Sequence, residues 1–188
     1  GLPADFPPLA SPGAIPNNLP IQLTSFIGRD DDLETLPSRV VGNRLVTLVG
    51  VGGSGKTRLG IETATAVLPD FADGVWWVDL VPLEHPEQVL KEVAHVLGVR
   101  EGPNEALFAA LVTAIGADHK LVILDNCEHL LQASAALASE LLHACPNLHI
   151  LATSREPLNV RGEVTYTLRP LTYPDPCEPL PFPTLAGT

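Results

Sequence analysis

The amino-acid sequence predicts an α/β fold in which helices cover both faces of a central, mostly parallel sheet. Two observations support this prediction. Short apolar runs alternate along the chain with amphipathic stretches, a pattern typical of parallel strands and their crossover helices. A glycine-rich segment follows directly after the first apolar run and precedes a helical pattern, as in proteins that bind phosphates at the carboxyl end of a strand. We therefore expect three layers: helices, sheet and helices.

The first expected elements enclose the glycine-rich segment. Leu45–Val49 is a run of apolar and β-branched residues that is too short for a buried helix, so we expect a strand. After the glycines, apolar residues repeat with helical spacing from Leu59 to Val67, and Pro69 marks the end of this helix. Val75–Leu80 has the composition of a second strand.

Two helices are expected next, each with recognisable ends. Pro86 stands where a first helical residue would be, and Gly98 follows the last apolar residue of the same pattern as a stop. Asn104 could cap the next helix, whose apolar stripe runs over Leu107–Ile115 and is followed by Gly116. Both patterns fit helices that pack on a sheet.

The remaining elements complete the alternation of strands and helices. Leu121–Asp125 is an apolar run that predicts the third strand, and Leu130 opens a helical pattern that must end before Pro146. Leu148–Thr153 is expected to be the fourth parallel strand. Val164–Leu168 alternates in polarity, so we expect it at the edge of the sheet.

The composition limits what the chain can do. It has 188 residues, of which 45% are hydrophobic, so a disordered or fibrous protein is excluded for most of its length. A formal net charge of −11 would repel a phosphate backbone, and we expect no direct nucleic-acid binding by this segment. No uncharged apolar stretch reaches the roughly 18 residues of a membrane span. The three cysteines form no CxxC motif, which fits a reducing compartment, and we expect a cytoplasmic location.

Prolines cluster towards both ends of the chain. Residues 1–20 and 170–188 hold 12 of the 19 prolines, and proline removes a backbone donor and disfavours helix. We therefore expect a proline-rich linker over residues 1–20, a nucleotide-binding domain over residues 21–171 and a second linker over residues 172–188. The chain contains no methionine, which leads us to expect an internal segment of a longer protein.

The segment GVGGSGKT, from Gly50 to Thr57, matches G-x-x-x-x-G-K-S/T, the Walker A motif, at every fixed position. Its glycines let the backbone approach a polyphosphate closely, so that consecutive N–H groups form an anion-binding nest. The helix that begins near Gly55 adds the positive end of its dipole. Lys56 supplies a charge for the β and γ phosphates, and the Thr57 hydroxyl supplies an oxygen for Mg²⁺. These residues predict a P-loop NTPase three-layer sandwich.

A carboxylate at the end of a neighbouring strand would complete such a site. The apolar residues from Leu121 to Leu124 end in Asp125, and a buried aspartate is costly unless a cation or hydrogen bonds meet it. We expect Asp125 to hold Mg²⁺ through water, with Thr57 as the other metal-binding residue. The alternative is that Asp125 caps the next helix.

Three residues after these strands are candidates for the hydrolytic step. Asn126 stands where hydrolytic P-loop enzymes commonly carry a second carboxylate, and an amide can orient a water but cannot accept its proton. Glu128 is the nearest acid, and it either activates water or stabilises a helix N-terminus. Arg155 is placed to sense the γ phosphate, unless it pairs with Glu156. The candidate catalytic residues are thus Lys56, Asp125, Asn126, Glu128 and Arg155.

Four motifs in this order, LTSFIGRDDDL, GVGGSGKT, LVILDNCEHLL and ILATSREPL, give the chain a resemblance to a known class. Over about residues 18–171 it resembles the STAND class of P-loop ATPases, the NB-ARC-like group. More closely, it is similar to the ATPase core of large bacterial LuxR-type transcriptional regulators. The proline-rich start looks like the linker that follows a class III nucleotide cyclase domain in some of these regulators.

The resemblance implies ATP or ADP and Mg²⁺ as cofactors. It also implies that Phe26, Ile27, Gly28 and Arg29 form the motif that borders the adenine and the sugar, and that Thr153, Ser154 and Arg155 occupy the sensor position. The expected nucleotide-binding residues are Phe26, Ile27, Gly28, Arg29, Gly50, Val51, Gly52, Gly53, Ser54, Gly55, Lys56, Thr57 and Arg58. The partners that it implies are other domains of a parent chain: a helical lid, a winged helix and a DNA-binding helix-turn-helix.

We therefore expect a regulatory switch that binds nucleotide and hydrolyses ATP slowly, within a larger signalling protein. A nucleotide-dependent oligomer is compatible with this function. The first alternative is a small-molecule kinase, against which stands the lack of any arginine between Arg100 and Arg155 to form a basic lid. The second is a degenerate interaction module that no longer binds nucleotide, against which stand the intact Lys56, Thr57 and Asp125.

Overall fold

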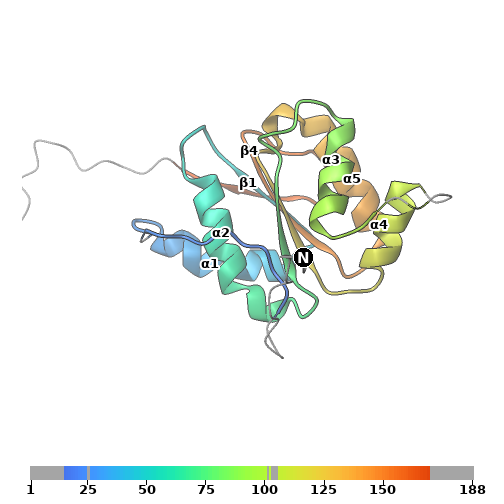
Figure 1. The fold of residues 1–188 in the computed structure, drawn as a ribbon. Coiled ribbons are helices and arrows are strands. Elements are labelled where there is room, and N and C mark those ends of the chain that lie inside the picture. The colour runs from blue at the N-terminus through green and yellow to red at the C-terminus, as the bar shows by residue number, and fades with distance from the viewer. Residues whose placement is uncertain (1–14, 25, 101, 103–105, 170–188) are drawn as a thin grey trace, which may run out of the picture.

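The sheet lies at the centre of the molecule. The computed structural model describes residues 15–24, 26–100, 102 and 106–169. Five strands follow the order β2-β3-β4-β1-β5, and all neighbouring strands are parallel (Figure 1). The strands are β1 (Leu45–Val49), β2 (Val75–Asp79), β3 (Leu121–Asp125), β4 (His149–Ser154) and β5 (Val164–Thr167). Their carboxyl ends therefore meet at one edge of the sheet.

Helices cover both faces of this sheet, which confirms the predicted three layers (Figure 1). One face carries α1 and α2, and the other carries α3, α4 and α5. Their bounds are α1 (Asp30–Gly42), α2 (Lys56–Ala66), α3 (Glu87–Val96), α4 (Leu107–Ile115) and α5 (Leu131–Ala144), with short 3₁₀ helices at Leu68–Asp70 and Cys127–His129. A membrane-spanning segment would have to be longer and more apolar than any helix in the described ranges.

Strand β3 shows how the sheet is anchored between the two helical layers. Leu121 and Ile123 pack towards α1 and α2, whereas Val122 and Leu124 pack towards α3, α4 and α5. All four side chains are at most 2% exposed. Burying a side chain of this size contributes about 1.5–3 kcal/mol. The central strands are therefore firmly held, and they fix the loops at their carboxyl ends.

Helix α1 was not predicted. Three aspartates occupy its first turn, where negative charge is favourable to the helix dipole, and the buried Leu36 and Val40 lie one turn apart. Pro37 stands in the middle of the helix and can donate no hydrogen bond to Leu33. Because the proline and the acidic start are untypical of a packed helix, the sequence does not reveal the short apolar stripe that packs α1 on the sheet.

The predicted strands are all present; β1 and β3 have the predicted bounds, and the ends of the other three differ by one residue. β2 stops before Leu80, whose N–H donates to the carbonyl oxygen of Asp125 where the chain leaves the sheet. β4 begins at His149 and continues to Ser154, one residue later at each end than predicted. β5 stops before Leu168 and lies at the sheet edge, as predicted.

The predicted helices are also present. α2 ends before Pro69, which lies in a 3₁₀ helix instead. Pro86 precedes the first residue of α3, and Gly98 follows that helix with a φ of 71°. Leu130 is the residue before α5. The expected cap Asn104 lies outside the described residues.

Part of the expected N-terminal linker contacts the sheet. Asn17 forms a bridge with Val75 at the edge of β2, and the carbonyl oxygen of Pro16 accepts a hydrogen bond from the Val75 N–H. The side-chain amide of Asn18 donates to the carbonyl oxygen of Trp77 and accepts from its N–H, at 2.9 and 2.6 Å. The residues before position 21 that the structure describes thus lie along β2. The division into a domain and two linkers stays a prediction.

Candidate functional site

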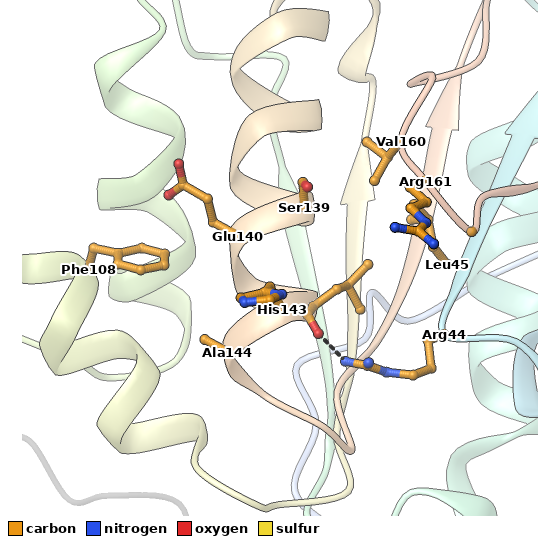
Figure 2. A pocket seen from close by; sticks show the side chains of 11 residues that line it. Arg44, Leu45, Phe108, Ser139, Glu140, His143, Ala144, Val160 and Arg161 are labelled. Carbon is orange, nitrogen blue, oxygen red and sulfur yellow. Dashed lines mark hydrogen bonds between the residues drawn. The ribbon is translucent and has the colours of Figure 1, made fainter.

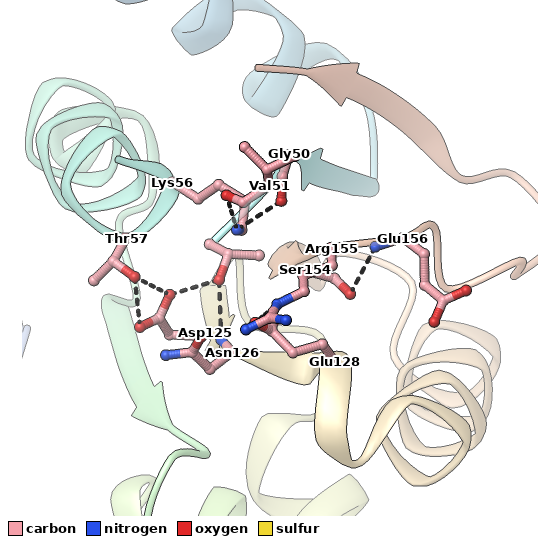
Figure 3. A network of polar contacts seen from close by, with 11 residues as sticks. Gly50, Val51, Lys56, Thr57, Asp125, Asn126, Glu128, Ser154, Arg155 and Glu156 are labelled. Atoms are coloured by element: carbon pink, nitrogen blue, oxygen red, sulfur yellow. Dashed lines mark hydrogen bonds and ion pairs between the residues drawn. The ribbon is translucent and has the colours of Figure 1, made fainter. Parts of the chain in front are cut away.

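The carboxyl ends of β1, β3 and β4 place the predicted motifs around one cleft (Figure 3). The loop between β1 and α2 forms one wall, and the residues that follow β3 and β4 form the other. The cleft has a volume of about 580 Å³. It is lined by Gln22, Gly52, Gly53, Gly55, Lys56, Thr57, Arg58, Ile61, Asn126, Glu128 and Arg155.

The loop before α2 has a backbone that only small residues allow. A side chain at Gly50 would place its Cβ 2.9 Å from the Ser54 hydroxyl oxygen and 3.1 Å from the carbonyl oxygen of Leu168. Gly55, the residue that precedes α2, has a φ of 90° in the left-handed region. No side chain caps the N-terminus of α2, so its first N–H groups and its positive dipole end face the cleft.

Lys56 is buried at the start of α2. Its ammonium group donates to the carbonyl oxygens of Gly50 and Val51 at 2.8 and 3.2 Å (Figure 3). These bonds hold the side chain back along the loop, so that the positive charge lies beside the loop and not in solvent. An anion bound by the loop would therefore meet this charge.

Asp125 lies at the end of β3 and joins three elements. Thr57 on α2 donates its hydroxyl to the two carboxylate oxygens at 3.0 and 3.1 Å, and Thr153 on β4 donates to one of them at 2.6 Å. Burial raises the pKa of the Asp125 carboxyl above its usual value, although the bonds from Thr153 and Thr57 act in the opposite direction. Neither α5 nor the 3₁₀ helix after β3 has a side-chain cap, so Asp125 is no helix cap in this structure.

Hard oxygen ligands suit a divalent cation at this position. The Asp125 carboxylate and the Thr57 hydroxyl face each other at the mouth of the loop, which is the donor set that Mg²⁺ prefers. A buried carboxylate with a raised pKa also gains from a nearby cation, because the cation offsets the loss of hydration. The residues therefore fit the metal ion that the sequence predicts.

Arg155 and Glu128 form an ion pair across the cleft wall. Arg155 Nε lies 3.1 Å from Glu128 Oε1, and the two side chains are 66% and 18% exposed (Figure 3). The other oxygen of Glu128 is buried and has no partner in the described part of the chain. The alternative partner of Arg155, Glu156, does not form this pair; its N–H donates to the hydroxyl of Ser154 instead.

Asn126 follows Asp125 in a left-handed conformation, with a φ of 64°. Asparagine tolerates this region better than most side chains. Its N–H donates to the hydroxyl oxygen of Thr153 at 2.9 Å, which ties the end of β3 to β4. The side chain then lines the cleft beside Glu128.

The residues implied to border adenine and sugar lie close to the loop but do not line the cleft. The Phe26 ring lies under the guanidinium of Arg58, 5.7 Å from its centre, and Ile27 is 80% exposed. Arg29 is buried and donates to the carbonyl oxygen of Ser54 at 2.9 Å. Gly28 has a φ of 80°.

Sequence reasoning missed two residues that line the cleft, Gln22 and Ile61. Ile61 follows Thr57 by four positions on α2, so helical spacing alone places the two on one face. Gln22 carries no comparable signal, because its position depends on how the N-terminal segment passes the loop.

A second hollow, of about 650 Å³, lies near the start of β1 between α4, α5 and the loop before β5 (Figure 2). Arg44 there donates to the carbonyl oxygens of Leu142, Cys145 and Leu148. The arginine thus satisfies the end of α5, and the hollow holds none of the predicted functional residues.

Sequence comparisons link the chain to mycobacterial and streptomycete regulators. No protein-family model matches it. It is 47% identical over 133 residues to a protein of Mycobacterium tuberculosis named as an HTH-type transcriptional regulator, covering 71% of this chain and 15% of that protein. It is 30% identical over 166 residues to the regulatory protein AfsR of Streptomyces griseus, covering 81% of this chain and 16% of the relative. The chain thus spans about a sixth of the length of these relatives.

Solved structures with the same fold share little sequence with the chain. A STAND protein with a tetratricopeptide repeat sensor from Pyrococcus horikoshii matches with a TM-score of 0.53 at 17% identity, over 79% of this chain and 24% of that one. The ORC2 protein of Aeropyrum pernix matches with a TM-score of 0.54 at 14% identity, over 78% and 44% of the two chains. The chain therefore has the P-loop NTPase three-layer fold.

Proposed function

We propose that this chain is a nucleotide-binding switch domain of a larger regulatory protein, which binds ATP or ADP with Mg²⁺ and hydrolyses ATP slowly. One observation carries the proposal. Lys56 and Thr57 line the cleft beside the glycine-rich loop, and the Thr57 hydroxyl donates to the Asp125 carboxylate next to them. These are the residue types that bind a polyphosphate and its metal ion.

Different residues of the chain would bind the phosphates and the metal ion. Gly52, Gly53 and Gly55 line the cleft, and their N–H groups and the N-terminus of α2 would surround a β phosphate. Lys56 would supply the charge next to it. Thr57 and Asp125 would hold Mg²⁺, which neutralises phosphate charge and orients the γ phosphate when bound.

Hydrolysis needs a group that accepts a proton from water. Asn126 can orient the water and Glu128 is the carboxylate that could accept its proton, but Glu128 is engaged by Arg155. A γ phosphate that attracts Arg155 would release Glu128 for this role. Turnover then depends on breaking the pair, which favours slow hydrolysis and the behaviour of a switch.

The relatives support a regulatory setting. A protein named as an HTH-type transcriptional regulator and the regulatory protein AfsR each contain a segment similar to this chain and are much longer than it. We infer a cytoplasmic parent of the STAND class, close to the LuxR-type regulators, in which nucleotide exchange alters contacts with a lid, a winged helix and a DNA-binding domain. A preceding cyclase domain and a nucleotide-dependent oligomer belong to the same proposal.

Titration calorimetry with ATP and ADP, with and without Mg²⁺, tests the proposal. The Lys56→Ala variant should bind either nucleotide about tenfold to a hundredfold more weakly, because a charge-assisted contact contributes about 1.5–3 kcal/mol. Lys91→Ala, which removes an exposed lysine of α3, should bind like the unaltered chain. Equal affinity in all three proteins would show that the loop is not the site. No binding by the unaltered chain would favour a degenerate interaction module.

A further inference from the structure

Arg29 binds the back of the phosphate-binding loop. The residue is only 8% exposed and is not among the residues that line the cleft. Its Nη2 donates to the carbonyl oxygen of Ser54 at 2.9 Å, and its Nη1 pairs with Asp32 at 3.2 Å. The guanidinium therefore contacts the loop outside the cleft.

The bond to Ser54 sets the orientation of one peptide unit. The peptide between Ser54 and Gly55 is planar and trans, so its C=O and N–H groups point in opposite directions. Because the carbonyl points to Arg29, the N–H of Gly55 points away from Arg29, towards the cleft that Gly55 lines. Among the described residues, the structure gives this N–H no acceptor.

Arg29 is itself held from a second side. Asp32 binds the guanidinium through one carboxylate oxygen and accepts a hydrogen bond from the Tyr166 hydroxyl through the other, at 2.6 Å. The side chains of Arg29 and Asp32 are 7% and 21% exposed. These contacts thus connect β5 with α1 and with the loop, and the side chains that form them are largely shielded from water.

We propose that Arg29 is a positioning residue for phosphate binding. It holds the peptide between Ser54 and Gly55 so that the Gly55 N–H faces the β phosphate, while Asp32 balances the charge of the guanidinium. The inference rests on the proposed function, since the anion is the polyphosphate of a nucleotide. It gives Arg29 a role apart from the adenine and the sugar.

The first test needs no ligand. The amide resonance of Gly55 is recorded in the whole chain and in the variants Arg29→Lys, Arg29→Ala and Arg39→Ala, the last an exposed arginine of the same helix. We expect Arg29→Ala to shift this resonance and to speed its exchange with solvent, Arg29→Lys to do so less, and Arg39→Ala to leave it unchanged. An unshifted Gly55 resonance in a folded Arg29→Ala protein overturns the proposal, and Arg29→Lys serves if Arg29→Ala does not fold.

The second test measures binding of pyrophosphate and ADP by calorimetry. Arg29→Ala should bind both about tenfold to a hundredfold more weakly, and Arg29→Lys should recover part of the loss. Equal affinities of the variants and the unaltered chain overturn the positioning role. If the unaltered chain binds neither probe, the proposed function fails, and the Gly55 resonance alone then decides whether Arg29 orients the loop.

Discussion

At the scale of single residues, Asp125 carries an energetic conflict. Its carboxylate is buried, and two hydroxyl groups, from Thr57 and Thr153, meet only part of its need for hydrogen bonds. The raised pKa means that the folded chain disfavours the ionised form compared with water. A cation at the Thr57 hydroxyl would offset this cost, so that under the proposed function Asp125 lowers the stability of the ligand-free domain and favours metal binding.

The variant Asp125→Asn tests both parts of this conflict, the binding of the metal ion and the stability of the ligand-free chain. The variant should bind ADP without metal as the unaltered chain does, but its ATP binding should no longer respond to Mg²⁺, because an amide is a weaker ligand than a carboxylate. The unfolding temperature of the ligand-free variant should rise, since the buried charge is gone. Calorimetry and thermal unfolding measure the two effects.

Asp70→Asn is the matched control for this variant. Asp70 lies in the 3₁₀ helix after α2, is exposed, does not line the cleft and is not among the groups that act on the Asp125 carboxyl. Its replacement should change neither the Mg²⁺ response nor the unfolding temperature. An unchanged Mg²⁺ response in Asp125→Asn would show that the carboxylate is no metal ligand.

At the scale of the elements, α1 is fastened at both ends. Before its first turn, Arg29 donates to the carbonyl oxygen of Ser54 in the glycine-rich loop. At its last turn, His149 on β4 donates from Nδ1 to the carbonyl oxygens of Val40 and Asn43, at 3.1 and 3.0 Å. Burial lowers the pKa of the His149 imidazole, although the two carbonyl groups act in the opposite direction.

The stability of the domain should therefore depend on pH through His149. In the unfolded chain a histidine takes up a proton near pH 6.5, whereas the folded chain resists this down to its lower pKa. The unfolding free energy should thus decrease as the pH falls below about 6.5 and should be insensitive to this group above that value. Urea unfolding between pH 5 and 7.5 measures the dependence.

His149→Gln should flatten this part of the profile, because the amide keeps a donor but does not titrate. His95→Gln, at an exposed position of α3, should leave the profile as it is. A His149→Gln profile parallel to that of the unaltered chain would exclude the group as the cause.

At this scale, the sequence predicts those features that depend on residues close to one another in the chain. The strands and the loop from Gly50 to Thr57 follow from short apolar runs and a fixed motif, and both lie where expected. The pair of Arg155 and Glu128 joins residues 27 positions apart, and only the adjacency of β3 and β4 brings them together. Local patterns do not contain that adjacency. The position of Gln22 at the cleft was missed for the same reason.

At the scale of the whole molecule, the order β2-β3-β4-β1-β5 determines where chemistry can occur. It places β4 between β1 and β3, so that residues after β4 face both the glycine-rich loop and the carboxylate of Asp125. The cleft has walls from these loops, and Arg155 at its rim is two-thirds exposed. Exclusion of water from such a cleft requires further protein, and catalysis of hydrolysis depends on that exclusion.

Hydrolysis by these 188 residues should therefore be slow, well below about one turnover per second. A longer protein that includes the segment after residue 188 should hydrolyse ATP faster, and Arg155→Ala should lower the rate in that longer protein. Phosphate release measured on the three proteins gives the comparison. Rapid turnover by the 188 residues alone would favour a self-sufficient enzyme, such as a kinase, over a switch.

The contact between Asn18 and β2 bears on how the outer edge of the sheet is protected. β2 is an outer strand of the sheet, and a bare outer strand is a template for aggregation between copies. The Asn18 side chain forms hydrogen bonds with both backbone groups of Trp77, and the carbonyl oxygen of Pro16 accepts one from the N–H of Val75. These bonds satisfy part of the exposed edge of β2, as a short additional strand would. A fragment that begins at residue 21 would lack these contacts, and we expect it to aggregate more readily than the longer chain. Residues that composition assigns to a linker would then protect the sheet edge.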